Sequence, residues 1–336
     1  MKLKKILENK QLFLLLILIL IWIVFGLVNP EILSVASVYA LFRSSIVPLL
    51  IALPEMMIII MGGIDMVFTI VVASSSYCSL LFWTKVSGVN APFIGILLMS
   101  MMIGVLCYVI CWFFIEKVKI PTFITTLGAN SLIKGFVLAF VGTSYVNSLP
   151  NCIKSINSMN LATAKTFNGA DSILHGSIIF VIIIYILMYI MMEKTVFGRK
   201  LYAIGANEDF ARRAGINVSK VRLISFVIAG IICAWAGLLH DSLSRLSMPI
   251  PVDIVGKELN SIAAVVIGIG GSKKAGGAVV GTALGVLLLQ LIMTNLVMLG
   301  VPSYWQQLVS GIIIMGGLSL QTINLNKKGN GGLIND

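Results

Sequence analysis

Charged residues and reactive motifs are both scarce in this sequence. Only 11% of its 336 residues are Asp, Glu, Lys or Arg, whereas soluble domains carry about 25%. No Gly-x-x-x-x-Gly-Lys-Ser/Thr loop, His-Glu-x-x-His pair or Gly-x-Ser-x-Gly segment occurs. The chain therefore lacks an ATP-binding P-loop of its own, and we predict a protein that is not an enzyme and uses no metal or cofactor.

Histidine and cysteine are rare as well. The two histidines, His175 and His240, fall near the expected outer ends of apolar runs, where we expect solvated boundary residues rather than ligands. The five cysteines lack the spacing of a metal site. Neither residue type indicates a reactive centre.

Long apolar runs are what the sequence has in quantity. Hydrophobic residues make up 58% of the chain, and the mean hydropathy is +1.03. About 17 to 25 apolar residues cross the ~30 Å hydrocarbon layer as a helix, and runs this long without alternation exclude a β-barrel. We predict an all-α integral membrane protein of about ten transmembrane helices, at 12–28, 40–61, 66–84, 92–115, 121–141, 174–192, 221–239, 258–271, 277–298 and 304–321. No small-residue cleavage site follows the first run, so we expect a retained span rather than a signal peptide.

The positions of Lys and Arg predict the orientation. With the N-terminus inside, the inner segments hold 17 of these 24 residues and the outer segments hold 6, while Lys134 lies within a run. Because cytoplasmic loops retain Lys and Arg, we predict that both termini are cytoplasmic. The same bias explains the net charge of +11 without a nucleic-acid partner. We divide the chain into a cytoplasmic N-terminus at 1–11, a membrane domain at 12–321 with an outer loop at 142–173 and an inner loop at 193–220, and a cytoplasmic tail at 322–336.

The inner loop carries the signals of a short capped helix. An Asn N-cap, an acidic first turn, a basic last turn and a closing glycine follow one another at Asn207, Glu208, Asp209, Arg212, Arg213 and Gly215. Phe210 and Ala214 lie four residues apart and give this helix an apolar stripe. Since a solvated connecting helix needs no such stripe, we expect a protein partner to dock there.

Several segments together resemble the permeases of the ribose-type ABC importer family. Phe197–Ile216, followed by Asn217 and Val218, resembles the coupling-helix region of that family. Further segments match in order from about residue 40 to 320, at Gly62–Asp65, Pro121–Gly128, Glu258–Gly268, Val279–Thr282 and Leu299–Gln307. The sequence departs from the family pattern at Glu55, Val67 and Gly271–Gly276.

The resemblance implies both a fold and partners. It implies the ABC importer permease fold, in a multi-pass protein of the bacterial cell membrane that pairs with a second permease copy, either identical or related. Two cytoplasmic ATP-binding subunits would sit on the coupling helices, and an extracytoplasmic solute-binding protein would deliver the solute. The coupling residues would be Gly205, Asn207, Glu208, Phe210, Arg212, Arg213 and Gly215.

Polar residues within the apolar runs are candidates for the solute path. A buried ionisable or amide side chain in a bilayer usually faces a pore or a partner, and this description fits Glu55, Asp65, Asn130, Lys134, Gln290 and Asn295. Amides bind hydroxyl groups well, so we select Asn130 and Asn295 as path residues, with a helix–helix hydrogen bond as the alternative for each. We expect Asp65 to be a structural cap or an inner gate, and Glu55 to lie at a kink beside Pro54.

The glycine cluster Gly268–Gly277 does not match a phosphate-binding loop. We interpret it as a break between two tightly packed spans. The predicted function is thus transport of a small solute, a monosaccharide such as ribose, by the permease subunit of an ATP-driven importer. Nucleosides or branched-chain amino acids are alternative solutes. A proton-coupled secondary transporter using Glu55, Asp65 and Lys134 is an alternative mechanism, whereas a membrane enzyme lacks a catalytic constellation.

Overall fold

The computed structural model describes residues 10–167, 169, 171–270, 275–302, 304–312 and 315–316. Most of these residues are helical. The elements are α2 (Lys10–Val28), η1 (Pro30–Leu33), α3 (Val35–Ile60), α4 (Phe68–Ser87), η2 (Gly88–Asn90), α5 (Phe93–Phe113), η3 (Phe114–Val118), α6 (Thr122–Phe136), η4 (Val137–Val141), α7 (Asn151–Asn157), β1 (Asn160–Lys165), β2 (Asp171–His175), α8 (Ser177–Lys194), α9 (Val196–Ala206), α10 (Glu208–Arg213), α11 (Val218–Ser244), α12 (Glu258–Ile269) and α13 (Ala275–Met298). A further helical segment covers 304–312.

Each of the ten predicted runs overlaps a helix in the described part of the chain, while residue 271 of the eighth run and residues 313–314 and 317–321 of the tenth lie outside the described residues. In the described part of the chain, seven helices are long and apolar enough to cross a membrane: α2, α3, α5 with η3, α6 with η4, α8, α11 and α13. α4 has a polar centre at Ser74–Ser76, all buried inside the protein, and α12 has only 12 residues. An integral membrane protein is therefore confirmed, while ten spans and the side of the termini stay predictions.

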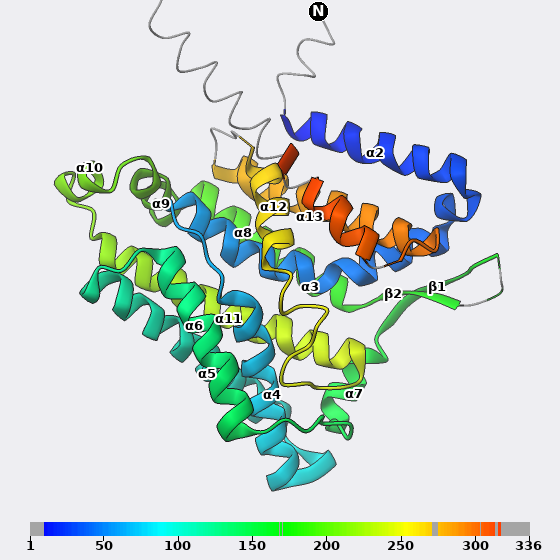
Figure 1. The fold of residues 1–336 in the computed structure, drawn as a ribbon, viewed down its shortest axis with the longest axis horizontal. Coiled ribbons are helices and arrows are strands. Elements are labelled where there is room, and N and C mark those ends of the chain that lie inside the picture. Colours follow the sequence, from blue (N-terminus) through cyan, green and yellow to red (C-terminus); the bar gives the residue numbers. More distant parts are fainter. Residues whose placement is uncertain are drawn as a thin grey trace, which may run out of the picture.

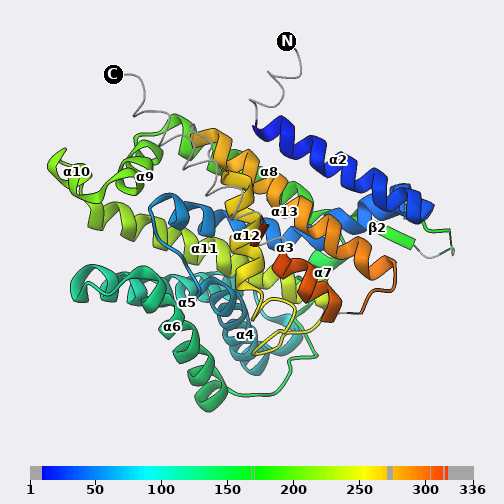
Figure 2. The ribbon, with the colours of Figure 1, turned by 45° about the horizontal axis from the view of Figure 1, so that its top comes forward.

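The helices pack in layers around α3 and α11. Figures 1 and 2 show these two helices in the middle of the bundle, with α5 and α6 on one side and α2 and α13 on the other. α5 approaches α11 so closely that a methyl group on Gly104 or Gly230 would overlap the backbone of the opposite helix. By contrast, α2 and α6 expose apolar side chains along most of their length, as expected for surfaces that face lipid.

The outer loop is more structured than the sequence suggested. It contains α7 and an antiparallel hairpin in which Thr163 pairs with Ile173, so the prediction of an all-α fold is corrected by one small sheet. The predicted run at 174–192 begins too early, because Leu174 and His175 belong to β2 and α8 starts at Ser177. Figure 1 shows the hairpin extending from the bundle at the end opposite to α10.

Both histidines are buried, contrary to the expectation of solvated boundary residues. His175 is 1% exposed, and its Nδ1 accepts a hydrogen bond from the backbone N–H of Ser177 at the start of α8. Burial and the charge of Arg43 lower the pKa of His175. His240 is 8% exposed near the end of α11. Sequence analysis missed the burial of the two histidines because a polar residue at the end of an apolar run can be covered by a segment distant in the sequence.

The glycine cluster is a helix break, as predicted. α12 ends at Ile269 and α13 begins at Ala275, while residues 271–274 lie outside the described part of the chain. A methyl group on Gly281 would overlap the carbonyl oxygen of Gly268. The two helices therefore pack with their backbones in direct contact.

Candidate functional site

The inner loop folds into two short helices, α9 and α10, whose N-terminal ends are capped by the side chains of Thr195 and Asn207. The carboxamide oxygen of Asn207 accepts the backbone N–H of Phe210 at 2.9 Å, which is the N-cap contact that the sequence predicted. Gly215 has a φ of +80°, and the next residue, Ile216, donates its N–H to the carbonyl of Ala211. This left-handed closure ends α10 after six residues.

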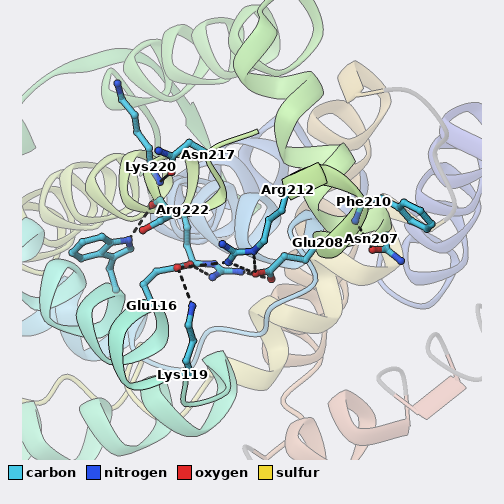
Figure 3. Close-up of polar contacts among 11 residues, drawn as sticks. Glu116, Lys119, Asn207, Glu208, Phe210, Arg212, Asn217, Lys220 and Arg222 are labelled. Carbon is cyan, nitrogen blue, oxygen red and sulfur yellow. Dashed lines mark hydrogen bonds and ion pairs between the residues drawn. The ribbon is translucent and has the colours of Figure 1, made fainter. Parts of the chain in front are cut away.

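Four alternating charges hold α10 to two other elements. Arg212 Nη2 lies 2.6 Å from Glu208 Oε1 and 3.9 Å from Glu116 Oε2. Arg222 near the start of α11 contacts Glu116 and lies 2.9 Å from Glu208 Oε2. Lys119 adds a further contact to Glu116 at 3.7 Å. Figure 3 shows these side chains converging on one point between the end of α5 and α10.

The network shifts the pKa of Glu208, which is half-buried. Partial burial raises the pKa of Glu208, but Arg212 and Arg222 lower it further, so that the pKa lies below its ordinary value. Glu208 therefore stays charged at neutral pH. Sequence analysis missed Glu116 and Arg222, because they lie 106 residues apart and nothing local indicates that they meet.

Two of the predicted coupling residues, Phe210 and Arg213, have side chains that form no hydrogen bond or ion pair with another described residue. Phe210 is 67% exposed, and Figure 3 shows it pointing away from the charge network. Arg213 and Ala214 are exposed as well. Gly205 is instead structural, because a methyl group there would overlap the carbonyl oxygen of Ile60 at the end of α3. The structure thus presents Phe210 outward from a helix that is fixed on its other side.

Glu55 and Asp65 meet in the interior where α3 turns into α4. Asp65 Oδ1 accepts the N–H of Val67 at 2.7 Å, and Oδ2 accepts the hydroxyl of Tyr108 at 2.6 Å. Glu55 Oε1 accepts the N–H of Asp65 at 3.5 Å. Glu55 Oε2 is buried and has no hydrogen-bond partner among the described residues. These contacts fit a structural cap at Asp65.

The two amides selected from sequence lie on different helices, Asn130 on α6 and Asn295 on α13. Asn130 Nδ2 donates to the carbonyl of Met66 at 2.5 Å and to Glu258 Oε1 at 3.4 Å. The hydroxyl of Thr69 also donates to Glu258. Asn130 therefore joins helices to each other. Asn295 is buried on α13 at 3% exposure.

A cavity of about 840 Å³ opens at the other end of the molecule from α10. It is bordered by parts of α3, β2, α11, α12, α13 and the helical segment 304–312. Its polar lining consists of Arg43, Ser44, Thr166, Asp171, Ser172, His240, Ser244, Asp253, Lys257, Asn260, Ser261, Gln290, Gln306, Gln307 and Ser310. Of the polar residues that the sequence analysis selected from the runs, Gln290 lines the cavity, whereas Glu55, Asp65, Asn130 and Asn295 do not.

One helix connects the charge network to the cavity. α11 carries Arg222 near its start and His240 near its end, and 18 residues of helix extend about 27 Å. His240 Nε2 lies 2.8 Å from Asp253 Oδ2 in the loop that borders the cavity. Ser247 in the same loop donates to Asp241 at 2.7 Å. α11 is therefore held at both ends by polar contacts.

Comparison with known proteins identifies the family. The family model for the permease component of branched-chain amino acid transport systems matches residues 37–318. The ribose import permease protein RbsC of Bacillus subtilis is 32% identical over 89% of this chain and 88% of its own length. The autoinducer 2 import system permease protein LsrC of Salmonella typhi is 28% identical over 94% of this chain and 86% of its own length.

The RbsC protein of Haemophilus influenzae is 29% identical over 89% of this chain and 88% of its own length. No solved structure matches. Since the family model covers most of the chain, including α10 and the cavity, the chain belongs to the branched-chain amino acid transport system permease component family and is a multi-pass permease of the bacterial cell membrane.

Proposed function

We propose that this chain is the transmembrane subunit of an ATP-driven importer and that its solute is a small sugar such as ribose. The observation that carries the proposal is α10, a short helix with Phe210 67% exposed and its other face held by ion pairs to Glu116 and Arg222. A helix fixed in this way can transmit a displacement of a bound partner to the membrane domain. The chain has no P-loop of its own, so a cytoplasmic ATP-binding subunit is the partner that supplies the energy.

The charge network gives a path for the motion. When ATP-binding subunits close, α10 moves with them. The ion pairs of Arg212 and Arg222 then carry this displacement to the end of α5 and to α11, and α11 reaches the cavity. An extracytoplasmic binding protein delivers the solute to the cavity, and a second permease copy completes the membrane assembly.

Sugar is proposed over other solutes because import permeases for ribose and autoinducer 2 are similar to this chain along most of their lengths. The family description names branched-chain amino acids, and these remain the solutes to be tested beside sugars. A proton-driven carrier using Lys134 is less well supported, because Lys134 is exposed on α6 and no hydrogen bond or ion pair joins it to Glu55 or Asp65 in the described part of the chain.

Reconstituted transport tests the proposal. Liposomes containing this chain, an ATP-binding subunit and a solute-binding protein from the same organism are given labelled ribose, with or without internal ATP. Uptake that requires ATP, the ATP-binding subunit and the binding protein is the expected result. Uptake by this chain alone under a proton gradient would replace the importer with a secondary carrier. ATP-driven uptake of valine but not of ribose would support the ATP-driven importer and identify its solute as an amino acid instead of a sugar.

A further inference from the structure

The polar side of the outer cavity consists mainly of neutral groups. Four carboxamides line it, at Asn260, Gln290, Gln306 and Gln307, together with the hydroxyls of Ser44, Thr166, Ser172, Ser244, Ser261 and Ser310. Carboxamides and hydroxyls both donate and accept hydrogen bonds, as sugar hydroxyls do. The chemistry of the lining is thus that of a hydroxyl-rich solute.

Two of these amides have unused hydrogen-bonding capacity. Gln290 is half-buried on α13, between the buried Leu289 and Leu291, and its carboxamide has no hydrogen-bond partner among the described residues. Asn260 Oδ1 accepts the hydroxyl of Ser310 at 2.5 Å, which fixes the side chain and leaves its NH₂ group to donate. Because a half-buried amide needs a partner, both groups are ready to bind water or a solute.

The charged side chains around the cavity are of both signs. Arg43 and Lys257 line it, and so do Asp171 and Asp253. His240 already contacts Asp253 at 2.8 Å. A site that bound an anion or a cation would show an excess of the opposite charge. The lining therefore does not select a solute of one charge, and the carboxylate of Asp253 that could bind an ammonium group already contacts His240.

The lining also lacks the rings that tight sugar and nucleoside sites use. No Phe, Tyr or Trp is among the described residues that border the cavity. Stacking on such a ring supplies much of the binding energy for a nucleobase or a sugar face. Hydrogen bonds alone exchange for those of water with little net gain, so the cavity can hold a solute only weakly.

We infer that the outer cavity is a weak holding site for a neutral polyhydroxylated solute without a nucleobase, in which Gln290 and Asn260 are the specificity-determining contacts. The inference rests on the proposed function and adds the place and the chemistry of solute contact. It differs from the sequence-based selection, which chose Asn130 and Asn295. A weak site retains the delivered solute while the outer side closes, and it still releases the solute inward.

Transport per ATP is the quantity that this site controls. Replacing Gln290 or Asn260 with Leu removes hydrogen-bonding groups and lets the solute escape outward before the transporter opens inward. We expect Gln290→Leu and Asn260→Leu to lower ribose uptake per ATP hydrolysed by roughly three- to tenfold, the value of about one hydrogen bond. Gln11→Leu is the matched control, because it removes an amide that bonds Gly277 between α2 and α13, away from the cavity. Unchanged uptake in the cavity variants, or an equal loss in the control, would overturn the inference.

A labelling assay separates this inference from the proposed function. Ser261→Cys places a thiol in the cavity lining, and its reaction with a small membrane-impermeant thiol reagent is followed in liposomes without ATP or partner subunits, against wild type as background. Ribose at millimolar concentration should slow the reaction, whereas adenosine and valine should not. Protection by valine, or by none of the three, would overturn the inference. Protection by ribose without ATP-driven uptake would leave the inference standing and refute the proposed importer.

Discussion

Phe210 is the single side chain on which the docking proposal depends. Because it is 67% exposed, its removal should leave the fold almost unchanged. We predict that Phe210→Ala lowers both ATP-driven uptake and the ATPase rate at least tenfold, since exposed aromatics that bury on docking commonly contribute about 2 kcal/mol or more. Reconstituted transport measures this effect. Phe167→Ala, at a residue 74% exposed beside the hairpin, is the control, and equal losses in the two variants would argue against docking at α10.

Glu116 is the residue that joins three basic side chains. It is 5% exposed and contacts Arg222, Arg212 and Lys119. Glu116→Gln leaves part of this positive charge without its buried partner, so we predict a loss of about 1–3 kcal/mol in the free energy of unfolding. Thermal unfolding in detergent should show a midpoint several degrees lower. Asp209→Asn removes an exposed carboxylate from α10 and should leave the midpoint near wild type, and a similar shift in both variants would contradict the special role of Glu116.

At the scale of elements, the sequence predicted helices well and their neighbours poorly. The apolar runs follow from hydropathy along the chain. The capped helix α10 follows from local residues such as Asn207 and Gly215. The hairpin does not, because its residues 160–175 are mostly polar and small and resemble a loop. The charge network also escapes prediction, since Glu116 gains its role only when α5 packs beside α11. Likewise, the cavity is lined by segments more than 250 residues apart.

The packing of α9 against α3 can be tested at Gly205. A methyl group there would overlap the carbonyl oxygen of Ile60, a backbone atom that cannot rotate away. We predict that Gly205→Ala lowers the free energy of unfolding by about 1–3 kcal/mol and reduces the response of the ATPase rate to the binding protein. Gly128→Ala is the matched control, because a methyl group on Gly128 in α6 meets no atom within 4 Å, and Ala favours a helix. Equal unfolding midpoints for the two variants would show that α9 does not pack as described.

At the scale of the whole molecule, orientation is the main prediction that transport depends on. Since Lys and Arg gather on the side of α10, that end should face the cytoplasm and the hairpin should face outward. We predict that a membrane-impermeant thiol reagent labels Lys165→Cys on the exposed hairpin in intact cells, whereas Lys220→Cys at the start of α11 is labelled only after permeabilisation. Both side chains are exposed, which makes them comparable. Labelling in the opposite order would show the opposite orientation in the membrane, with the cavity on the cytoplasmic side.

The length of α11 between its two polar anchors has a consequence for how the ends move together. Arg222 and His240 are separated by 18 residues, and because an α-helix has 3.6 residues per turn, this separation is about five full turns. The two side chains therefore leave the helix in the same direction. A rotation of α11 by roughly 20° would move both tips, ~6 Å from the axis, by about 2 Å to the same side. Twisting one helix would thus loosen the contact of Arg222 with Glu208 and that of His240 with Asp253 in a single step.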